Sequence, residues 1–251
     1  WIHVLHDVQL FVPSGRLTSW MPVTLFQRFC ACLRHIVMGD PQVVISPTEI
    51  LLTAHRTRGF FRTSKMCVIP NPAPTSQILP RTRHAPLRVA FVGRWAEDKG
   101  SALLESLWHD PCLSSIEWHL IGPDTERAHP PQGRTYGFSS TEFILNVFDD
   151  MDLLVVPSQI MENQPTVLLE AFSRGLPVIA SHQSGIVETL GEAGTVCDSH
   201  DRQAWKSALL ACMNESDSAY QDRIRLMIAR GIRYEPEQVI QRVEEVLVTL
   251  N

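Results

Sequence analysis

Short apolar runs and longer amphipathic stretches follow one another in a regular order through residues 84–251. The apolar runs are rich in β-branched side chains and end at glycine or proline, which predicts strands. We expect strands at 87–92, 116–121, 134–138, 152–156, 177–180 and 193–197. The stretches between them predict helices at 99–108, 140–150, 165–174 and 185–190, with further helices over most of 200–251. This alternation favours a parallel sheet covered by helices on both faces.

The N-terminal part has a similar but shorter pattern. It predicts strands at 2–5, 42–45 and 66–69 and a helix at 49–58. Three strands are few for a doubly wound domain, so we expect the first strands and helices of this unit to be absent from the chain.

Residues 20–37 form an amphipathic stretch of this N-terminal part. Its apolar stripe comprises Val23, Phe26, Phe29, Cys30, Leu33 and Val37. Such a stripe is typical of the core-facing side of a helix, and we favour that interpretation. Arg28, Arg34 and His35 leave a helix on a membrane surface as the alternative.

Proline marks a boundary between the two parts. Three prolines stand in residues 70–74, and Pro80 and Pro86 follow. Proline fixes φ and lacks a donor, so this stretch predicts an extended linker. We place the boundary between residues 83 and 84.

Charge is divided unevenly across this boundary. Residues 1–83 carry nine Lys and Arg against three Asp and Glu, whereas residues 84–251 carry thirteen against twenty-four. The basic part could therefore face anionic lipid or an anionic acceptor, with ordinary surface variation as the alternative. In 251 residues, a 44% hydrophobic share and a net charge of −5 exclude a disordered chain. No apolar run is long enough to span a bilayer.

Six scattered cysteines include only one close pair, Cys30 and Cys32, which is not a zinc signature. We expect buried free thiols and a cytoplasmic protein.

The loop after the strand at 87–92 carries two cations. Gly93-Arg94-Trp95-Ala96-Glu97-Asp98-Lys99-Gly100 places an arginine and a lysine between two glycines that allow close backbone approach. Open parallel sheets bind ligands at the carboxyl ends of their strands, and two cations there suit a diphosphate. The order of residues does not fit a P-loop. The chain also lacks Gly-x-Gly-x-x-Gly, which counts against an NAD dehydrogenase.

Two carboxylates stand eight residues apart around the start of the helix at 165–174. Glu162 lies in the loop before this helix and Glu170 lies within it. The free amides of the first helical turn can hold anionic oxygens. Glu162 can accept hydrogen bonds from sugar hydroxyls, and Glu170 can accept them from a ribose diol.

Residues 66–200 resemble the donor-binding half of a retaining glycosyltransferase of the GT-B fold, similar to glycosyltransferase family 4. Ile69-Pro-Asn-Pro72 resembles that family's interdomain linker, and the loop at 93–100 resembles its phosphate-binding loop. Glu162 and Glu170 match its E-x7-E motif. The resemblance implies an α/β protein of two Rossmann-like doubly wound domains, of which the N-terminal one is truncated. Residues 1–83 would be the C-terminal part of the N-terminal acceptor-side domain plus the linker. Residues 84–251 would be the donor-binding domain with C-terminal bracing helices.

The resemblance also implies roles for named residues. Arg94 and Lys99 would neutralise the donor diphosphate, Glu162 would bind the transferred sugar, and His6 would contact that sugar or orient the acceptor. Residues 136–138 correspond to the segment that seats the base. The full donor-binding set is Gly93, Arg94, Lys99, Phe138, Glu162, Asn163, Gln164, Thr166, Val167 and Glu170.

These relatives need no cofactor and use a nucleoside-diphosphate sugar as substrate. The implied reaction is retaining and independent of metal, and it serves a saccharide or a lipid-linked glycan in the cytoplasm or at the inner membrane face, without nucleic acid. Asp150-Met-Asp152 fits a metal-binding D-x-D motif, but its place between a helix and an apolar strand makes us expect no metal there. The alternatives are a nucleotide-sugar-binding module that is inactive alone and a GT-B-fold epimerase.

Overall fold

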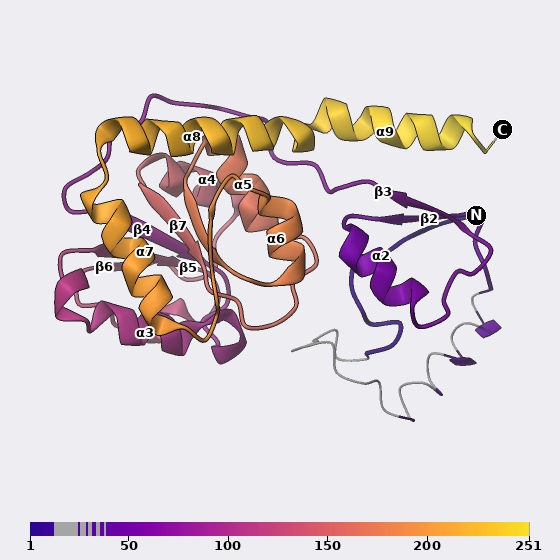
Figure 1. The fold of residues 1–251 in the computed structure, drawn as a ribbon, viewed down its shortest axis with the longest axis horizontal. Coiled ribbons are helices and arrows are strands. Elements are labelled where there is room, and N and C mark those ends of the chain that lie inside the picture. The colour runs from indigo at the N-terminus through magenta and orange to yellow at the C-terminus, as the bar shows by residue number, and fades with distance from the viewer. Residues whose placement is uncertain (13–24, 26–28, 30–31, 34–35, 38, 251) are drawn as a thin grey trace.

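The structure, a computed structural model, describes residues 1–12, 25, 29, 32–33, 36–37 and 39–250. Two parallel sheets organise it (Figure 1). We name the three-stranded sheet with its helix the N-terminal lobe and the six-stranded sheet with its helices the C-terminal lobe. The N-terminal lobe consists of β1 (Ile2–Val4), β2 (Val43–Ser46), β3 (Lys65–Val68) and α2 (Glu49–Arg56).

The six-stranded sheet has the order β6-β5-β4-β7-β8-β9, and every neighbouring pair is parallel. This is the Rossmann strand order, which reverses between β4 and β7. The strands are β4 (Arg88–Val92), β5 (Glu117–Ile121), β6 (Gly133–Thr135), β7 (Leu153–Val156), β8 (Val178–Ser181) and β9 (Thr195–Cys197). All six expected strands of this part are therefore present, with ends that differ by a few residues.

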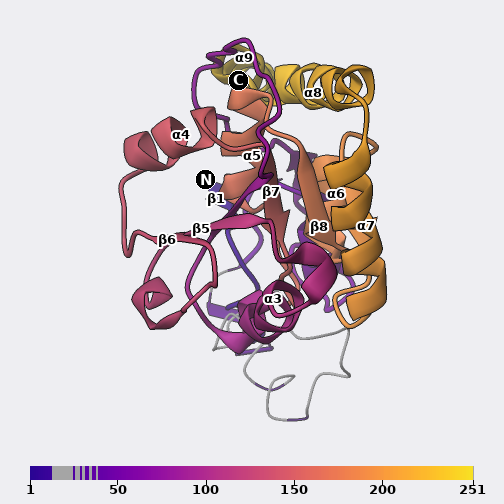
Figure 2. The same ribbon diagram turned by 90° about the vertical axis from the view of Figure 1, so that its left-hand side faces the viewer.

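Helices cover both faces of this sheet (Figures 1 and 2). Alternate residues of β7 point to opposite cores: Leu154 joins the core under α4, α5, α6 and α8, and Val155 joins the core under α3 and α7. This alternation explains why the central strand is apolar throughout. The helices are α3 (Ser101–Trp108), α4 (Thr141–Asp149), α5 (Thr166–Arg174), α6 (Ser184–Leu190), α7 (Arg202–Asn214), α8 (Asp217–Gly231) and α9 (Pro236–Val248).

The proline-rich segment fastens to the C-terminal lobe through Arg81. Its buried guanidinium donates to the carbonyl oxygens of Phe148, Met151 and Arg174 at 2.8, 2.7 and 3.0 Å. Phe148 and Arg174 lie in the last turns of α4 and α5, where helix carbonyls lack donors further along the helix, and Met151 lies two residues beyond α4. The extended linker therefore closes two helices of the lobe that it joins.

The last helix returns towards the N-terminal lobe (Figure 1). Lys65 Nζ in β3 donates to Thr249 Oγ1, just beyond α9, at 2.8 Å. Val239 of α9 is buried, whereas Leu247 is exposed.

Two expectations need correction. Most of the stretch at 20–37 lies outside the described residues, including Val23, Phe26 and Cys30. Its described apolar residues Phe29, Leu33 and Val37 are exposed, so the core-facing interpretation is wrong for them. Cys197 and Cys212 are buried as expected, but Cys32 and Cys112 are exposed. Within the described ranges, no helix is long and apolar enough to cross a membrane.

Candidate active site

The reversal of strand order between β4 and β7 creates the candidate site. The helix after β4 packs on one face of the sheet and the helix after β7 packs on the other, so the two connecting loops separate at the carboxyl edge. These loops are residues 93–100 and 157–165. They carry the cations and the first glutamate that the sequence singles out.

The loop after β4 packs against α3 and against the loop after β7. Trp95 stacks on Trp108 of α3 with ring centroids 5.5 Å apart and an interplanar angle of 4°. Gly100 has φ 85°, and a Cβ there would lie 2.3 Å from the carbonyl oxygen of Pro157. The glycine was expected to allow close approach of the backbone to a ligand, but it allows close approach to the neighbouring loop. This contact brings Lys99 to the gap between the two loops.

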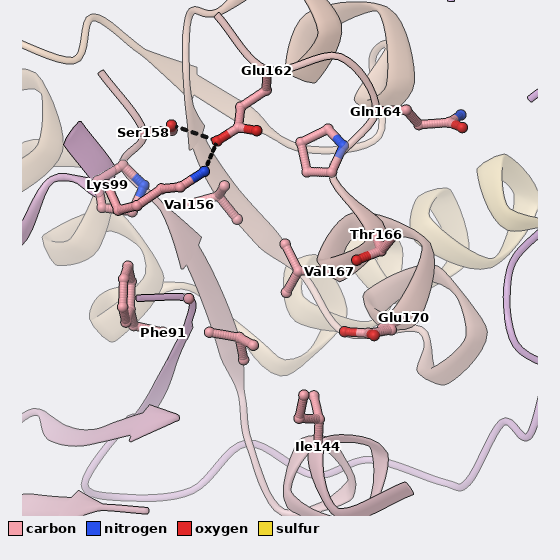
Figure 3. A pocket seen from close by; sticks show the side chains of 14 residues that line it. Phe91, Lys99, Ile144, Val156, Ser158, Glu162, Gln164, Thr166, Val167 and Glu170 are labelled. Atoms are coloured by element: carbon pink, nitrogen blue, oxygen red, sulfur yellow. Dashed lines mark hydrogen bonds and ion pairs between the residues drawn. The ribbon is translucent and has the colours of Figure 1, made fainter. Parts of the chain in front are cut away.

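Lys99 and Glu162 meet across this gap. Lys99 Nζ forms an ion pair with Glu162 Oε1, and Ser158 Oγ donates to the same oxygen at 2.7 Å (Figure 3). Ser158 is a site residue that the sequence analysis missed. The sequence feature that could have identified Ser158 is its position, just after a buried strand and four residues before Glu162.

Glu170 lies on the second turn of α5 and faces the same cavity (Figure 3). It is only 7% exposed, and burial raises the pKa of its carboxyl from 4.5 to about 7. Thr166 and Val167 open the helix, and Pro165 precedes it. Because proline has no N–H, the free amides of this turn begin with the residues that follow it.

These groups line a cavity of about 380 Å³. That volume lies within the range of small-molecule sites in proteins. Lys99 and Glu162 stand at one end of it, and Glu170 and Ile144 at the other (Figure 3). Its walls are Phe91, Val92, Gly93, Lys99, Ile144, Val156, Pro157, Ser158, Glu162, Gln164, Pro165, Thr166, Val167 and Glu170.

A second cavity, of about 330 Å³, opens towards the N-terminal lobe. His6 and Asp7, which follow β1, line it on one side. It shares Lys99, Glu162 and Gln164 with the first cavity. The two cavities therefore meet at the ion pair.

The structure gathers most of the expected site residues around these two spaces. The first cavity holds Gly93, Lys99, Glu162, Gln164, Thr166, Val167 and Glu170, and the second adds His6 and Asn163. Arg94 and Phe138 line neither one. Arg94 donates to both carboxylate oxygens of Asp98, at 3.0 and 3.2 Å, and Phe138 is 83% exposed. Their expected contacts with a donor stay predictions.

Asp152 of the D-x-D pair binds the start of β4 and the segment that leads into it. The Asp152 carboxylate accepts hydrogen bonds from the backbone amides of His84 and Arg88, at 3.0 and 2.8 Å. His84 Nδ1 lies 2.9 Å from the same carboxylate. Across the part of the chain that the structure describes, no three His, Cys, Asp or Glu side chains converge as a metal site.

A doubly wound sheet with a cavity at its switch point defines an α/β ligand-binding protein of the Rossmann type. The family model of glycosyl transferases group 1 matches residues 86–215, which include the whole first cavity. The chain belongs to this family.

One curated relative is the amylovoran biosynthesis glycosyltransferase AmsK of Erwinia amylovora. It is 29% identical over 150 residues, which cover 51% of this chain and 36% of AmsK. The chain thus spans only about a third of that relative's length.

Among the solved structures that match nearly all of this chain are two sugar-related proteins. HepE of Anabaena, solved with UDP-glucose, has a TM-score of 0.77 at 17% identity, and the match covers 99% of this chain and 72% of HepE. Sucrose-phosphate synthase of Thermosynechococcus elongatus has a TM-score of 0.69 at 19% identity, covering 100% of this chain and 67% of the synthase. These likenesses confirm the expected α/β fold of GT-B type.

Proposed function

We propose that this chain binds a nucleoside-diphosphate sugar in the first cavity and takes part in transferring the sugar to an acceptor hydroxyl in the second. The meeting of the two cavities at Lys99 and Glu162 carries this proposal. A donor and an acceptor bound in these spaces would face each other across that ion pair. We further propose the domain boundary at residues 83 and 84.

The polarity of the first cavity supports one orientation of the donor. At one end, Lys99 and the free amides of the first turn of α5 favour the diphosphate. Glu162 lies beside Lys99 and offers carboxylate oxygens to the hydroxyls of the attached sugar. At the other end, Glu170 offers oxygens to a ribose diol (Figure 3). Arg94 would have to leave Asp98 before it could reach the diphosphate.

We propose a retaining reaction without a metal ion. The bond between the anomeric carbon and the donor phosphate breaks, and the acceptor oxygen attacks from the same face. The acceptor proton passes to the departing phosphate oxygen, so the charge balances within the reacting pair. Lys99 stabilises the negative charge that grows on that phosphate, which is how preorganised cations accelerate such reactions. His6 would contact the sugar or orient the acceptor from the N-terminal side.

The relatives support a choice of donor and acceptor classes. We propose a UDP-sugar first, since HepE was solved with UDP-glucose. A saccharide or a lipid-linked glycan is the proposed acceptor, without nucleic acid, in the cytoplasm or at the inner membrane face. Peripheral membrane contact is supported by five exposed apolar residues at helical spacing: Leu25, Phe29, Leu33, Ile36 and Val37. Flotation of the protein with anionic vesicles would test this contact.

Binding of UDP, GDP, ADP, CDP and NAD, measured by thermal unfolding of the wild type and of Glu170→Ala, tests the donor site. A ligand at 100 times its Kd stabilises the folded state by about 2.7 kcal/mol. One diphosphate should shift the wild type and not the variant. A chain that binds none of them would refute the proposal.

Product analysis separates the remaining alternatives. Transfer that depends on an acceptor and persists in chelator supports a metal-independent glycosyltransferase. Donor binding without transfer would indicate a binding module that is inactive alone. A new sugar nucleotide formed without any acceptor would indicate an epimerase.

A further inference from the structure

The loop that carries Glu162 is held by the opposite lobe. Met161 packs against the hydrophobic core of the N-terminal lobe. Asn163 Nδ2 donates to the backbone oxygen of His6 at 2.8 Å, and Asn163 Oδ1 accepts from Thr48 Oγ1 at 2.6 Å. The two neighbours of Glu162 therefore contact the N-terminal lobe, while Glu162 itself faces the cavities.

Thr48 is the N-cap of α2, and the start of this helix makes a second contact between the lobes. The Glu188 carboxylate, from α6, accepts from the backbone amides of Glu49 and Ile50 at 2.7 and 3.0 Å. These first amides of a helix have no partner inside it. A glutamate of the C-terminal lobe thus completes a helix of the N-terminal lobe.

The two contacts are joined through Gly185. A Cβ at this position would lie 1.8 Å from the backbone oxygen of Asn163 and 2.1 Å from that of Glu162. Helix α6 therefore touches the Glu162 loop directly. We name the five residues that unite the loop, α6 and the start of α2 the interlobe joint: Thr48, Glu49, Ile50, Asn163 and Glu188.

We infer that Asn163 is a positioning residue, which fixes Glu162 in the pose that recognises the donor sugar by tying its loop to the N-terminal lobe. Glu188 supports the same joint from α6. The inference rests on the proposed function, since it concerns the sugar that Glu162 would bind. The Glu162 loop has no regular secondary structure, so its geometry depends on its contacts with the N-terminal lobe. Docking of that lobe can therefore control recognition of the donor sugar.

The geometry separates this role from nucleotide binding. Asn163 lines the second cavity and not the first, and Glu170 lies at the far end of the first cavity. Loss of the joint should therefore leave UDP binding nearly intact and reduce the added affinity that the sugar provides. Loss of the two Asn163 hydrogen bonds should lower that gain by about tenfold.

Calorimetry with UDP and UDP-glucose tests the inference, with GDP and GDP-mannose as the pair if guanine is the base that binds. In Asn163→Ala and Glu188→Ala, the Kd for UDP should stay within about twofold of the wild type, while the preference for UDP-glucose over UDP falls. Glu192→Ala, which removes an exposed carboxylate two residues beyond α6, is the matched control and should change neither value. Unchanged UDP binding also shows that each variant is folded.

A double-mutant cycle with Thr48→Ala sharpens the test. Because Thr48 and Asn163 share one hydrogen bond, their effects on the sugar preference should not add. Equal weakening of UDP and UDP-glucose in Asn163→Ala, or an unchanged preference, would overturn the positioning role alone. A wild type that binds UDP without preferring any UDP-sugar would also overturn it. A wild type that binds no nucleotide would refute the proposed function.

Discussion

Replacing Glu170 by glutamine should change how stability depends on pH. Burial raises the pKa of the Glu170 carboxyl from 4.5 to about 7 in the folded chain. The folded state therefore keeps this proton through a range of pH in which the unfolded state has lost it. By linkage, the stability from protonated Glu170 is complete below pH 4.5 and is lost as the pH rises to about 7.

The size of the effect follows from the same shift. One pKa unit corresponds to about 1.4 kcal/mol, so ionised Glu170 costs the folded state roughly 3 kcal/mol above pH 7. Glu170→Gln has a similar shape and cannot ionise. The wild type should therefore lose roughly 3 kcal/mol relative to Glu170→Gln between acidic and mildly alkaline pH.

Urea unfolding of both proteins at several values between pH 4.5 and pH 8 measures this difference. All other titrating groups are shared, so the difference between the two curves isolates Glu170. Glu192→Gln, at an exposed carboxylate, is the control and should follow the wild type. A difference that does not vary with pH would show that the carboxyl is solvated in the folded state, and the argument from burial would fail.

Three further substitutions test other parts of the structure. Lys99→Ala should weaken UDP by about tenfold and uridine by less than about twofold, because the proposed diphosphate position lies beside this lysine. Equal weakening of the two ligands in calorimetry would contradict this. Glu162→Gln should increase the affinity for UDP by about threefold at low salt, since Lys99 no longer pairs with a carboxylate. Weaker binding of UDP would contradict the competition between the carboxylate and the diphosphate for Lys99. Arg81→Ala should lower the free energy of unfolding by about 3 kcal/mol or more, because three backbone carbonyls at or near the ends of α4 and α5 lose a buried charged donor. An effect as small as that of exposed Arg127→Ala would refute this.

Local patterns were enough to predict most of the fold. The strand predicted at 152–156 is apolar after Asp152 because both of its faces are buried, and β7 occupies Leu153–Val156. Pro165 and Gly175 delimit the predicted helix, and α5 ends at Arg174, next to a glycine at φ 61°. Such signals lie within a few residues of each other, so the chain reveals them without its tertiary structure.

Contacts between distant segments could not be predicted in this way. Glu188 completes α2 from 139 residues away, and Asn163 bonds to a backbone oxygen 157 residues away. Arg94 follows its loop motif but turns to Asp98, four residues on. The sequence identifies each group and its charge, whereas only the packing decides which of several partners it takes.

The position of the site follows from the same packing. Among the strands of the larger sheet, β4 and β7 are the neighbours at which the strand order reverses, and their loops diverge there to opposite faces. Gly100 allows the two loops to touch at Pro157 before they separate. Lys99 from one loop and Glu162 from the other meet where the gap begins. The N-terminal lobe holds the second of these loops through Asn163, so the place where the ion pair forms is also the place where the two lobes join.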